Sequence, residues 1–163
     1  MKLLFICTHN RCRSIMAEAI ANDRKSSGLS GFSAGSSPQD QVHPLSLKYL
    51  QEHGIKTDAL KSQSWHDFET LKPDAIITLC DRAASEVCPV WFDDSLVVHW
   101  GLSDPSAEKN ESEQEKKFHY TIDLLSRRLD KLIEKENIEL RGDKLRELLT
   151  DLATFDIVSS KPV

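Results

Sequence analysis

Cys7 and Arg13 lie six positions apart, and Ser14 directly follows the arginine. The five residues between them are enough to curl the backbone so that successive N–H groups point inward and bind an anion. Arg13 and the start of the helix expected after it both favour negative charge, so a thiol at position 7 should lose its proton more readily than a free thiol. The Ser14 hydroxyl can donate to that thiolate. Cys7 is therefore a candidate nucleophile in a loop that binds an oxyanion.

The residues expected to surround the oxyanion follow the cysteine without a break: Thr8, His9, Asn10, Arg11, Cys12 and Arg13. This loop contains no glycine, which is unusual for a phosphate-binding loop, and Asn10 is the residue best suited to a left-handed backbone conformation there. Cys12 is expected to point toward the helix and to have a structural role. The loop lacks the Gly-Lys-Ser/Thr ending of a Walker-type nucleotide loop, so it does not predict a nucleotide site.

The loop needs a strand before it and a helix after it, and the sequence contains both patterns. The apolar residues 2–6 predict a buried strand, and the good helix formers of 14–25 predict a helix whose N-terminus faces the same anion. Further strands are expected at 32–34, 74–79 and 95–99, and further helices at 43–53, 65–71, 110–136 and 143–155, the last capped by Asp143. This alternation predicts an α/β fold with a doubly wound parallel sheet of about four strands flanked by helices, and an extra C-terminal helix.

The predicted sheet would bring two cysteines together. In doubly wound sheets, ligands bind beyond the carboxyl ends of the strands, where the strand order reverses. Cys7 follows the strand at 2–6 and Cys80 follows the strand at 74–79, so both can face the same crevice.

The length predicts one main domain, residues 1–140, followed by a C-terminal helical extension at 141–163. The apolar side of the helix expected in this extension favours packing against the domain. A contact with a partner or with a second copy of the chain is the alternative.

Composition and charge exclude several functions. The formal net charge is −5 and the Lys and Arg residues are scattered, so no face-long basic patch is available for nucleic acid. No apolar run approaches the roughly 18 residues of a membrane span, and the N-terminal apolar stretch is too short for a signal peptide. We therefore expect a cytoplasmic protein that binds neither nucleic acid nor membranes.

The cysteines are Cys7, Cys12, Cys80 and Cys88. In a reducing compartment they are not expected to form structural disulfides. The two pairs are five and eight positions apart. Zinc sites usually show Cys pairs about two to four residues apart, so no metal site is expected, and nothing in the sequence calls for a cofactor.

Further motifs accompany the anion loop: Phe32-Ser33-Ala34-Gly35, Thr78-Leu79-Cys80, Cys88-Pro89, and His99-Trp100-Gly101 leading to Asp104-Pro105. With these motifs, the chain resembles the arsenate reductases built on the low-molecular-weight protein tyrosine phosphatase fold. The resemblance runs from about residue 2 to about residue 135, so the C-terminal tail lies outside it.

The resemblance implies a catalytic role for each of six residues: Cys7 as nucleophile, Arg13 as oxyanion clamp, Ser14 as thiolate stabiliser, Asp104 as general acid, and Cys80 and Cys88 as redox relays. Arsenate would be the substrate, with phosphate and sulfate as analogues. Attack of Cys7 on arsenate would be followed by attack of Cys80 on Cys7, which releases arsenite, and then by attack of Cys88 on Cys80. Thioredoxin, or glutathione with glutaredoxin, would reduce the protein again, and the sequence does not choose between them.

Two other functions are compatible with these residues. A low-molecular-weight protein tyrosine phosphatase would use Cys7, Arg13 and Asp104 without a relay. In that branch an aromatic residue typically follows the Asp-Pro pair, whereas Ser106 follows it here, which favours a small inorganic anion. A non-catalytic redox or oxyanion sensor would stop after one equivalent of arsenate.

Some relatives bind potassium beside the anion loop. Asn10, Glu18 and Ser33 resemble positions used there, but the acid expected in the stretch 62–64 is absent. The sequence therefore does not predict a specific potassium site.

Overall fold

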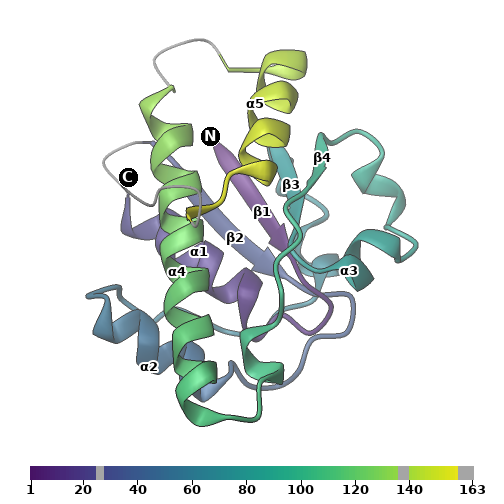
Figure 1. The fold of residues 1–163 in the computed structure, drawn as a ribbon. Helices are drawn as coiled ribbons and strands as arrows, with labels where there is room; N and C mark the ends of the chain where they lie inside the picture. Colours follow the sequence, from purple (N-terminus) through teal and green to yellow (C-terminus); the bar gives the residue numbers. More distant parts are fainter. Residues whose placement is uncertain (25–27, 136–139, 158–163) are drawn as a thin grey trace.

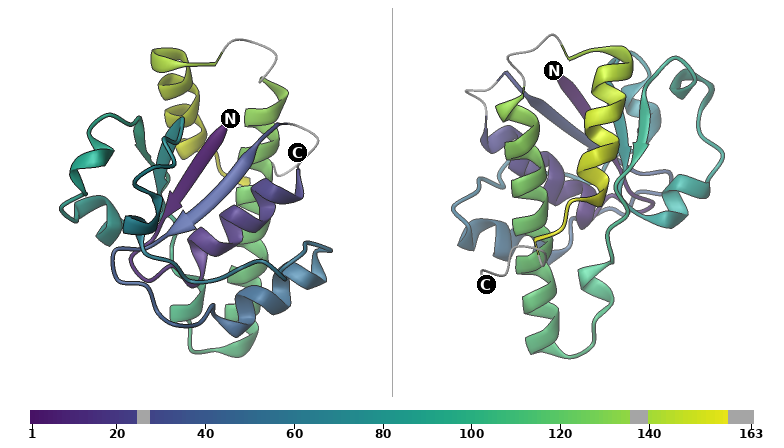
Figure 2. Two further views of the ribbon diagram at one scale, coloured as in Figure 1. Left: turned by 180° about the vertical axis from the view of Figure 1, so that it is seen from behind. Right: turned by 45° about the horizontal axis from the view of Figure 1, so that its top comes forward.

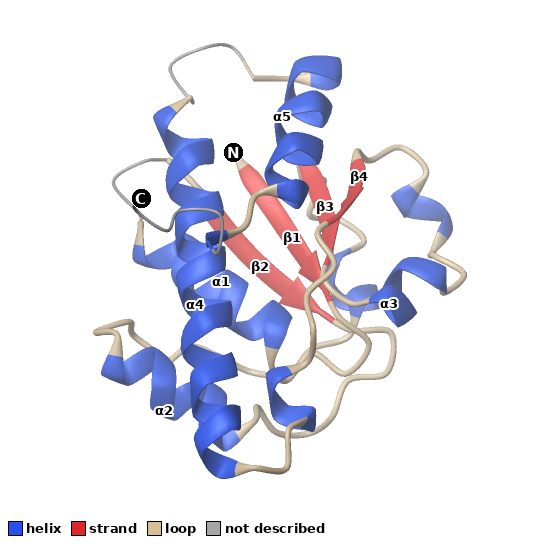
Figure 3. Cartoon of the chain, in the orientation of Figure 1, coloured by secondary structure: helices blue, strands red, loops and turns tan. Residues whose placement is uncertain are grey.

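The computed structural model describes residues 1–24, 28–135 and 140–157. Within these residues the strands form one parallel sheet in the order β2-β1-β3-β4 (Figure 1, Figure 3). The strands are β1 (Lys2–Ile6), β2 (Ser30–Ala34), β3 (Ala75–Thr78) and β4 (Val97–His99). This arrangement confirms the predicted doubly wound α/β fold. The strand order reverses between β1 and β3, so the ends of these two strands form the expected ligand crevice.

The α-helices in the described residues are α1 (Arg13–Asp23), α2 (Pro44–Glu52), α3 (Asp81–Ser85), α4 (Glu111–Glu134) and α5 (Gly142–Thr154). In the same described residues, 3₁₀ turns accompany them at η2 (Trp65–Phe68), η3 (Val90–Phe92) and η4 (Pro105–Ala107). None of the helices in this part of the chain has the length and apolar character needed to cross a membrane.

Both faces of β1 are covered. Leu3 and Phe5 point into the larger apolar cluster, to which α1, α4 and α5 contribute. Figure 1 and the tilted view of Figure 2 show α4 and α5 in front of the same face of the sheet, and α5 contacts both α4 and β4. Leu4 and Ile6 point into a second cluster on the other face, together with Trp65. A central strand buried on both sides fixes the position of the loop that follows it.

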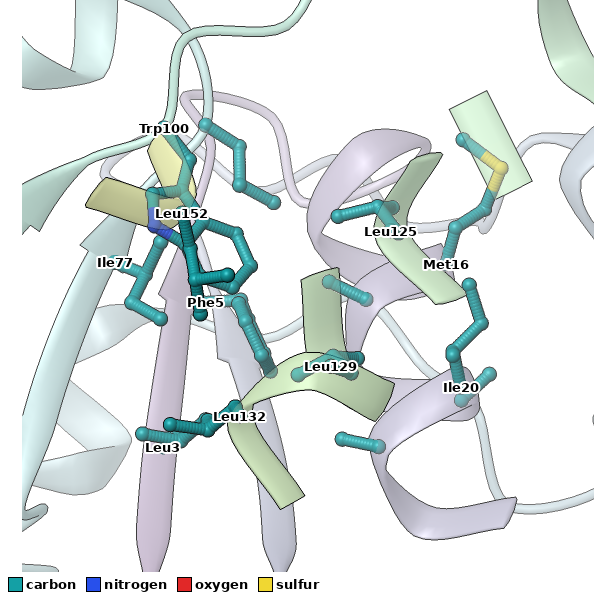
Figure 4. Close-up of a cluster of buried hydrophobic side chains, with 14 of the residues drawn as sticks. Leu3, Phe5, Met16, Ile20, Ile77, Trp100, Leu125, Leu129, Leu132 and Leu152 are labelled. Atoms are coloured by element: carbon teal, nitrogen blue, oxygen red, sulfur yellow. The ribbon is translucent and has the colours of Figure 1, made fainter. Parts of the chain in front are cut away.

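The larger cluster forms around one long amphipathic helix. The predicted apolar stripe of α4 faces the sheet, and Leu125, Leu129 and Leu132 from this stripe are buried there. Figure 4 shows these side chains near Trp100 and near Leu152 of α5. The predicted amphipathic helix is confirmed, with Asn110 as its cap.

Several predicted boundaries differ from the structure. The helix expected at 65–71 is the short turn η2, and β2 begins two residues earlier than expected. The helix expected at 14–25 begins at Arg13 and ends at Asp23, and Lys25 lies outside the described residues. The assignment of Asp143 as the cap of α5 was wrong, because the cap position is Arg141 and Asp143 lies in the first turn. An acidic side chain in a first turn still interacts favourably with the helix dipole.

Candidate active site

The anion loop connects the end of β1 to the start of α1, as predicted. Asn10 has a φ of 43°, which is the left-handed conformation expected for it. Its buried side chain donates to Ser14 Oγ and Ser33 Oγ, each at 2.9 Å, and accepts from the backbone N–H of Gln63 at 2.7 Å. Asn10 therefore fixes the loop to α1, to β2 and to the segment before η2.

Gly35, at the end of β2, allows the sheet to approach the loop closely. A Cβ atom at this position would lie 2.5 Å from the carbonyl oxygen of Thr8 and 2.8 Å from that of Cys7. Both contacts are with backbone, which cannot move without reshaping the loop. Only glycine fits here, which explains the glycine of the Phe32-Ser33-Ala34-Gly35 motif.

The loop retains hydrogen-bond donors that the protein does not use. The backbone N–H groups of Asn10, Arg11 and Cys12 donate to no acceptor in the described part of the chain. The Nε atoms of Arg11 and Arg13 are buried and likewise have no hydrogen-bond partner among the described residues. Buried donors at the N-terminus of an 11-residue helix are the environment that an oxyanion requires.

Arg13 and Asp104 are 91 positions apart in the sequence but meet in the structure. Arg13 Nη2 lies 3.4 Å from Asp104 Oδ2, and Arg13 Nη1 donates to the carbonyl oxygen of Leu102 at 2.8 Å. Asp104 Oδ1 accepts from the backbone N–H and the hydroxyl of Ser106, at 2.9 and 2.7 Å. The structure thus places a carboxyl group beside the arginine of the anion loop.

Cys7 and Cys80 form a buried, hydrogen-bonded thiol pair. Each side chain belongs to a residue that is 5% exposed. The hydrogen bond to Cys80 and burial raise the pKa of Cys7, and Arg13 only partly opposes them. The same hydrogen bond lowers the pKa of Cys80 to about 5, and the backbone N–H groups of Thr8 and Ala83 lower it further. The surroundings of the pair therefore favour a thiolate at Cys80 over a thiolate at Cys7.

This distribution of charge corrects one expectation from the sequence. We expected Cys7 to lose its proton more readily than a free thiol, because Arg13 and the dipole of α1 act on it, whereas its pKa is raised. The structure instead gives Cys80 more donors, since it caps α3 and accepts from the N–H of Ala83 at 3.3 Å. Ser14 Oγ accepts from Asn10, which leaves the hydroxyl proton of Ser14 unused in that bond, and its donation to the thiolate stays a prediction.

Cys88 lies in the same apolar cluster as Cys7 and Cys80. Its Sγ donates to the carbonyl oxygen of Glu86 at 3.7 Å, and burial together with the carboxylates of Glu86 and Asp93 raises its pKa. All of these cysteines are free thiols. The sulfurs of Cys7, Cys80 and Cys88 therefore lie on one side of the sheet.

Cys12 differs from the other cysteines. It is buried, and its sulfur accepts from the hydroxyl of Ser46 at 3.2 Å. Burial raises its pKa to about 12. A thiol of this kind remains protonated at neutral pH, which agrees with the structural role expected for it.

Two features of the site were missed from the sequence. Thr8 Oγ1 lies 3.6 Å from Cys80 Sγ and donates to Glu86 Oε1 at 3.3 Å, which links the anion loop to the segment between the two relay cysteines. His99 contacts Thr78 Oγ1 at 2.9 Å and Asp81 Oδ1 at 3.0 Å, and so attaches α3 to the end of β4. The position of His99 at the end of a predicted strand was the only available signal.

Asn10, Glu18 and Ser33 do come together, because Ser33 donates to Glu18 and accepts from Asn10. Burial raises the pKa of Glu18 to about 7. The stretch 62–64 contributes the backbone N–H of Gln63 and no carboxylate. We propose no potassium site here.

Comparison with known proteins agrees with this geometry. The profile of the family described as low molecular weight phosphotyrosine protein phosphatase matches residues 2–144. An arsenate reductase of Halalkalibacterium halodurans is 33% identical over 128 residues, which cover 78% of this chain and 91% of the relative. A glutaredoxin arsenate reductase of Synechocystis is 29% identical over 110 residues, which cover 68% of this chain and 82% of the relative.

Solved structures show the same likeness. A structure described as an arsenate reductase in the phosphate binding state superimposes with a TM-score of 0.67 at 26% identity. The match covers 82% of this chain and 97% of that chain. The chain therefore belongs to the low-molecular-weight phosphotyrosine protein phosphatase family, in the group formed by its arsenate reductases.

Proposed function

We propose that this protein reduces arsenate to arsenite by a thiol relay through Cys7, Cys80 and Cys88. The observation that carries this proposal is that Cys7 and Cys80 are both buried in one apolar cluster beside the anion loop, where the adjacent strands β1 and β3 end. Hydrolysis of a phosphate ester requires one nucleophilic sulfur and one acid. A second sulfur in contact with the nucleophile is required only if electrons are transferred.

The first step joins Cys7 to arsenic. Arsenate is a tetrahedral anion, so the free donors of the loop and the guanidinium of Arg13 can hold its oxygens. The sulfur of Cys7 attacks arsenic after its proton passes to the bound anion, so Cys80 remains a thiolate for the second step. An oxygen then leaves as water once it has received a proton, and Asp104 is the acid placed beside Arg13 to donate it.

The second step is the reduction. The thiolate of Cys80 attacks the sulfur of Cys7, a disulfide forms between them, and the bond from sulfur to arsenic breaks. The electron pair of that bond stays with arsenic, which changes from As(V) to As(III) and leaves as arsenite. The pKa of about 5 at Cys80 supports this role, because the attacking group is a thiolate at neutral pH.

The third step moves the disulfide outward. Cys88 attacks Cys80 and frees Cys7 for another cycle, which requires the segment between Cys80 and Cys88 to rearrange. Cys88 is flanked by the two large hydrophobic side chains with the highest exposure in the described part of the chain, Val87 at 94% and Val90 at 83%. An apolar rim around a redox cysteine favours a protein reductant over a small thiol acting alone.

We further propose that the reductant is thioredoxin or glutaredoxin supplied with glutathione. One relative is described as a glutaredoxin arsenate reductase, which supports the second choice. The cycle requires a compartment where thiols stay reduced, so we propose that the protein acts in the cytoplasm.

Weak phosphatase activity is the second candidate, because Cys7, Arg13 and Asp104 suffice for transfer of a phosphoryl group to sulfur. Ser106, whose hydroxyl donates to Asp104, follows the Asp104-Pro105 pair. Phosphatases of this family typically carry an aromatic residue at that sequence position. The site therefore lacks an aromatic side chain that could pack against the ring of phosphotyrosine. We expect slow hydrolysis of small aryl phosphates and no preference for phosphotyrosine.

The test is steady-state arsenate reduction by the full-length protein with each reductant system, beside hydrolysis of an aryl phosphate. Wild type should turn over many times with at least one system. Cys80→Ser should lose reduction but retain hydrolysis, and Cys7→Ser should lose both. Sustained reduction by Cys80→Ser would overturn the relay, and a single turnover by wild type with every reductant would favour a sensor.

A further inference from the structure

Arg128 of α4 is a buried cation that holds two distant segments of the chain. It is 4% exposed. Its Nη1 donates to the carbonyl oxygen of Trp100 at 3.0 Å, and its Nη2 donates to those of Ala153 and Phe155 at 2.9 and 3.1 Å. One side chain thus joins the residue after β4 to the end of α5. A guanidinium suits this role because it presents several donors in a rigid plane.

Trp100 is held on its ring as well as on its carbonyl group. It is 1% exposed, and its ring centroid lies 6.4 Å from that of Phe5 in β1. The guanidinium of Arg128 lies 5.4 Å from the ring centroid, and the indole Nε1 donates to the carbonyl oxygen of Leu149 in α5 at 2.8 Å. Figure 4 shows Trp100 close to Leu152 of the same helix. Apart from Phe5, these contacts come from α4 and α5.

The loop that carries Asp104 begins at Trp100. The backbone N–H groups of Trp100 and Leu102 donate to the carbonyl oxygens of Thr78 and Leu79, each at 2.8 Å. The carbonyl oxygen of Leu102 accepts from Arg13, which also approaches Asp104. The loop is therefore fixed at its base by the end of β3, by Arg128 and by α5, and at its tip by the anion loop.

Most of α5 extends beyond the part that this chain shares with its relatives. The family profile ends at residue 144, within the first turn of the helix. The arsenate reductase structure in the phosphate binding state is covered over 97% of its length, whereas 82% of this chain is covered. The contacts of α5 with Trp100 and Arg128 thus belong largely to the additional segment.

We propose that α5 and Arg128 form a brace that positions Asp104 for proton donation, which makes Arg128 a positioning residue in this protein. The inference rests on the proposed role of Asp104 as general acid. Without the guanidinium, the carbonyl groups of Trp100, Ala153 and Phe155 lose their buried donors, and the base of the loop must shift to satisfy them. A misplacement of about 1 Å at a reacting group can lower a rate by about 100-fold, and Asp104 lies only four residues beyond Trp100.

The experiment uses full-length variants and a single turnover of arsenate, with arsenite as the product measured. Arg128→Met should lower the rate at saturating arsenate by about tenfold, because positioned general acids contribute roughly 10²- to 10⁴-fold to rates. The arsenate concentration for half-maximal rate should change by less than about threefold, since loop amides hold the anion. Arg128→Lys should recover part of the rate.

Two control variants separate positioning from loss of stability. Arg127→Met removes a neighbouring but exposed charge from α4 and should leave the rate unchanged. Leu50→Ala removes buried apolar contacts of α2, which is not part of the brace, and should lower the melting temperature while the rate stays within about twofold of wild type. All rates are measured well below the melting temperature of the least stable variant.

A double-variant cycle provides the decisive readout. In the Asp104→Asn background, Arg128→Met should change the rate by less than about twofold, because an effect exerted through Asp104 disappears when the acid is absent. If the double variant showed the product of the two single-variant rate losses, the brace would be overturned. An unchanged rate in Arg128→Met alone would overturn it as well. If Asp104→Asn did not slow the wild-type reaction, both the acid role and this inference would be overturned while thiol reduction stood. Failure of wild type to form arsenite would overturn the proposed function itself.

Discussion

At the scale of single residues, the chemistry depends on where one proton lies in the pair Cys7 and Cys80. Arg13 and a helix N-terminus act on Cys7, but Cys80 accepts from Cys7 and from two backbone N–H groups. These contacts favour a thiol at the nucleophile Cys7 and a thiolate at the resolving Cys80. This arrangement suits a reductase, because the second sulfur must attack as soon as arsenic is bound.

Removal of the Cys7 thiol should raise the pKa of Cys80 above its value of about 5, because the hydrogen bond from Cys7 is the largest influence that lowers it. Titration of the ultraviolet thiolate absorbance of Cys7→Ala measures this shift. Cys7→Ser is the matched control, since its hydroxyl can still donate and should keep the titration closer to that of wild type. Identical titrations of Cys7→Ala and wild type would contradict this influence of Cys7 on Cys80.

Glu18 should make stability depend on pH. Its folded-state pKa of about 7 lies above the usual value of 4.5, so stability is undiminished below pH 4.5, falls as pH rises from 4.5 to 7, and stays reduced above pH 7. The side chain of Glu18→Gln cannot ionise, so the variant does not lose stability over this pH interval. The melting temperature of the variant should therefore exceed that of wild type at pH 8, and the difference should shrink toward pH 4.5. A difference that is constant with pH would contradict the assignment.

Sequence reasoning found the site residues but not their protonation. The spacing of Cys7 and Arg13, and the place of Asn10 in the loop, are local properties that a sequence displays directly. The preference for a thiolate at Cys80 over Cys7 depends on contact between residues 73 positions apart, and on the capping of α3 by a thiol. No local pattern encodes such a contact.

At the scale of elements, the end of β2 shapes the anion loop. Gly35→Ala would place a methyl group against the carbonyl oxygens of Cys7 and Thr8. We expect a loss of about 1 to 3 kcal/mol in the free energy of unfolding, measured with urea, and weaker phosphate binding by calorimetry.

Gly54→Ala is the matched control for this substitution. Gly54 has a φ of +73° and open space around the position of a Cβ atom. The variant should lose roughly 1 to 2 kcal/mol from backbone strain and bind phosphate like wild type. Equal phosphate affinity in the two variants would contradict the close fit between Gly35 and the loop.

The long elements were predictable because burial leaves a periodic pattern over many residues. The apolar run of β1 and the stripe of α4 are of this kind, and both are confirmed. The five-residue helix α3 was not predicted, since it is too short to show a period and its cap is the side chain of Cys80. Asp143 was assigned as a cap because the sequence does not reveal that α5 starts at Gly142, one residue before it.

At the scale of the whole molecule, the site joins segments from almost the full length of the chain. The order β2-β1-β3-β4 brings the ends of β1 and β3 side by side, which was predicted from the alternation of strands and helices. The brace formed by Arg128 and α5 was not predicted. The sequence shows that one side of α5 is apolar, but not that Leu149 accepts from Trp100 or that Arg128 is buried.

Peptide mapping of Cys88→Ser after reaction with excess arsenate and no reductant tests the central claim most directly. Without the thiol of Cys88, nothing attacks Cys80 in the third step, so the disulfide between Cys7 and Cys80 should remain. We expect one equivalent of arsenite and a disulfide between Cys7 and Cys80. Arsenite without this disulfide, or a disulfide that joins Cys7 to Cys12 instead, would contradict the account.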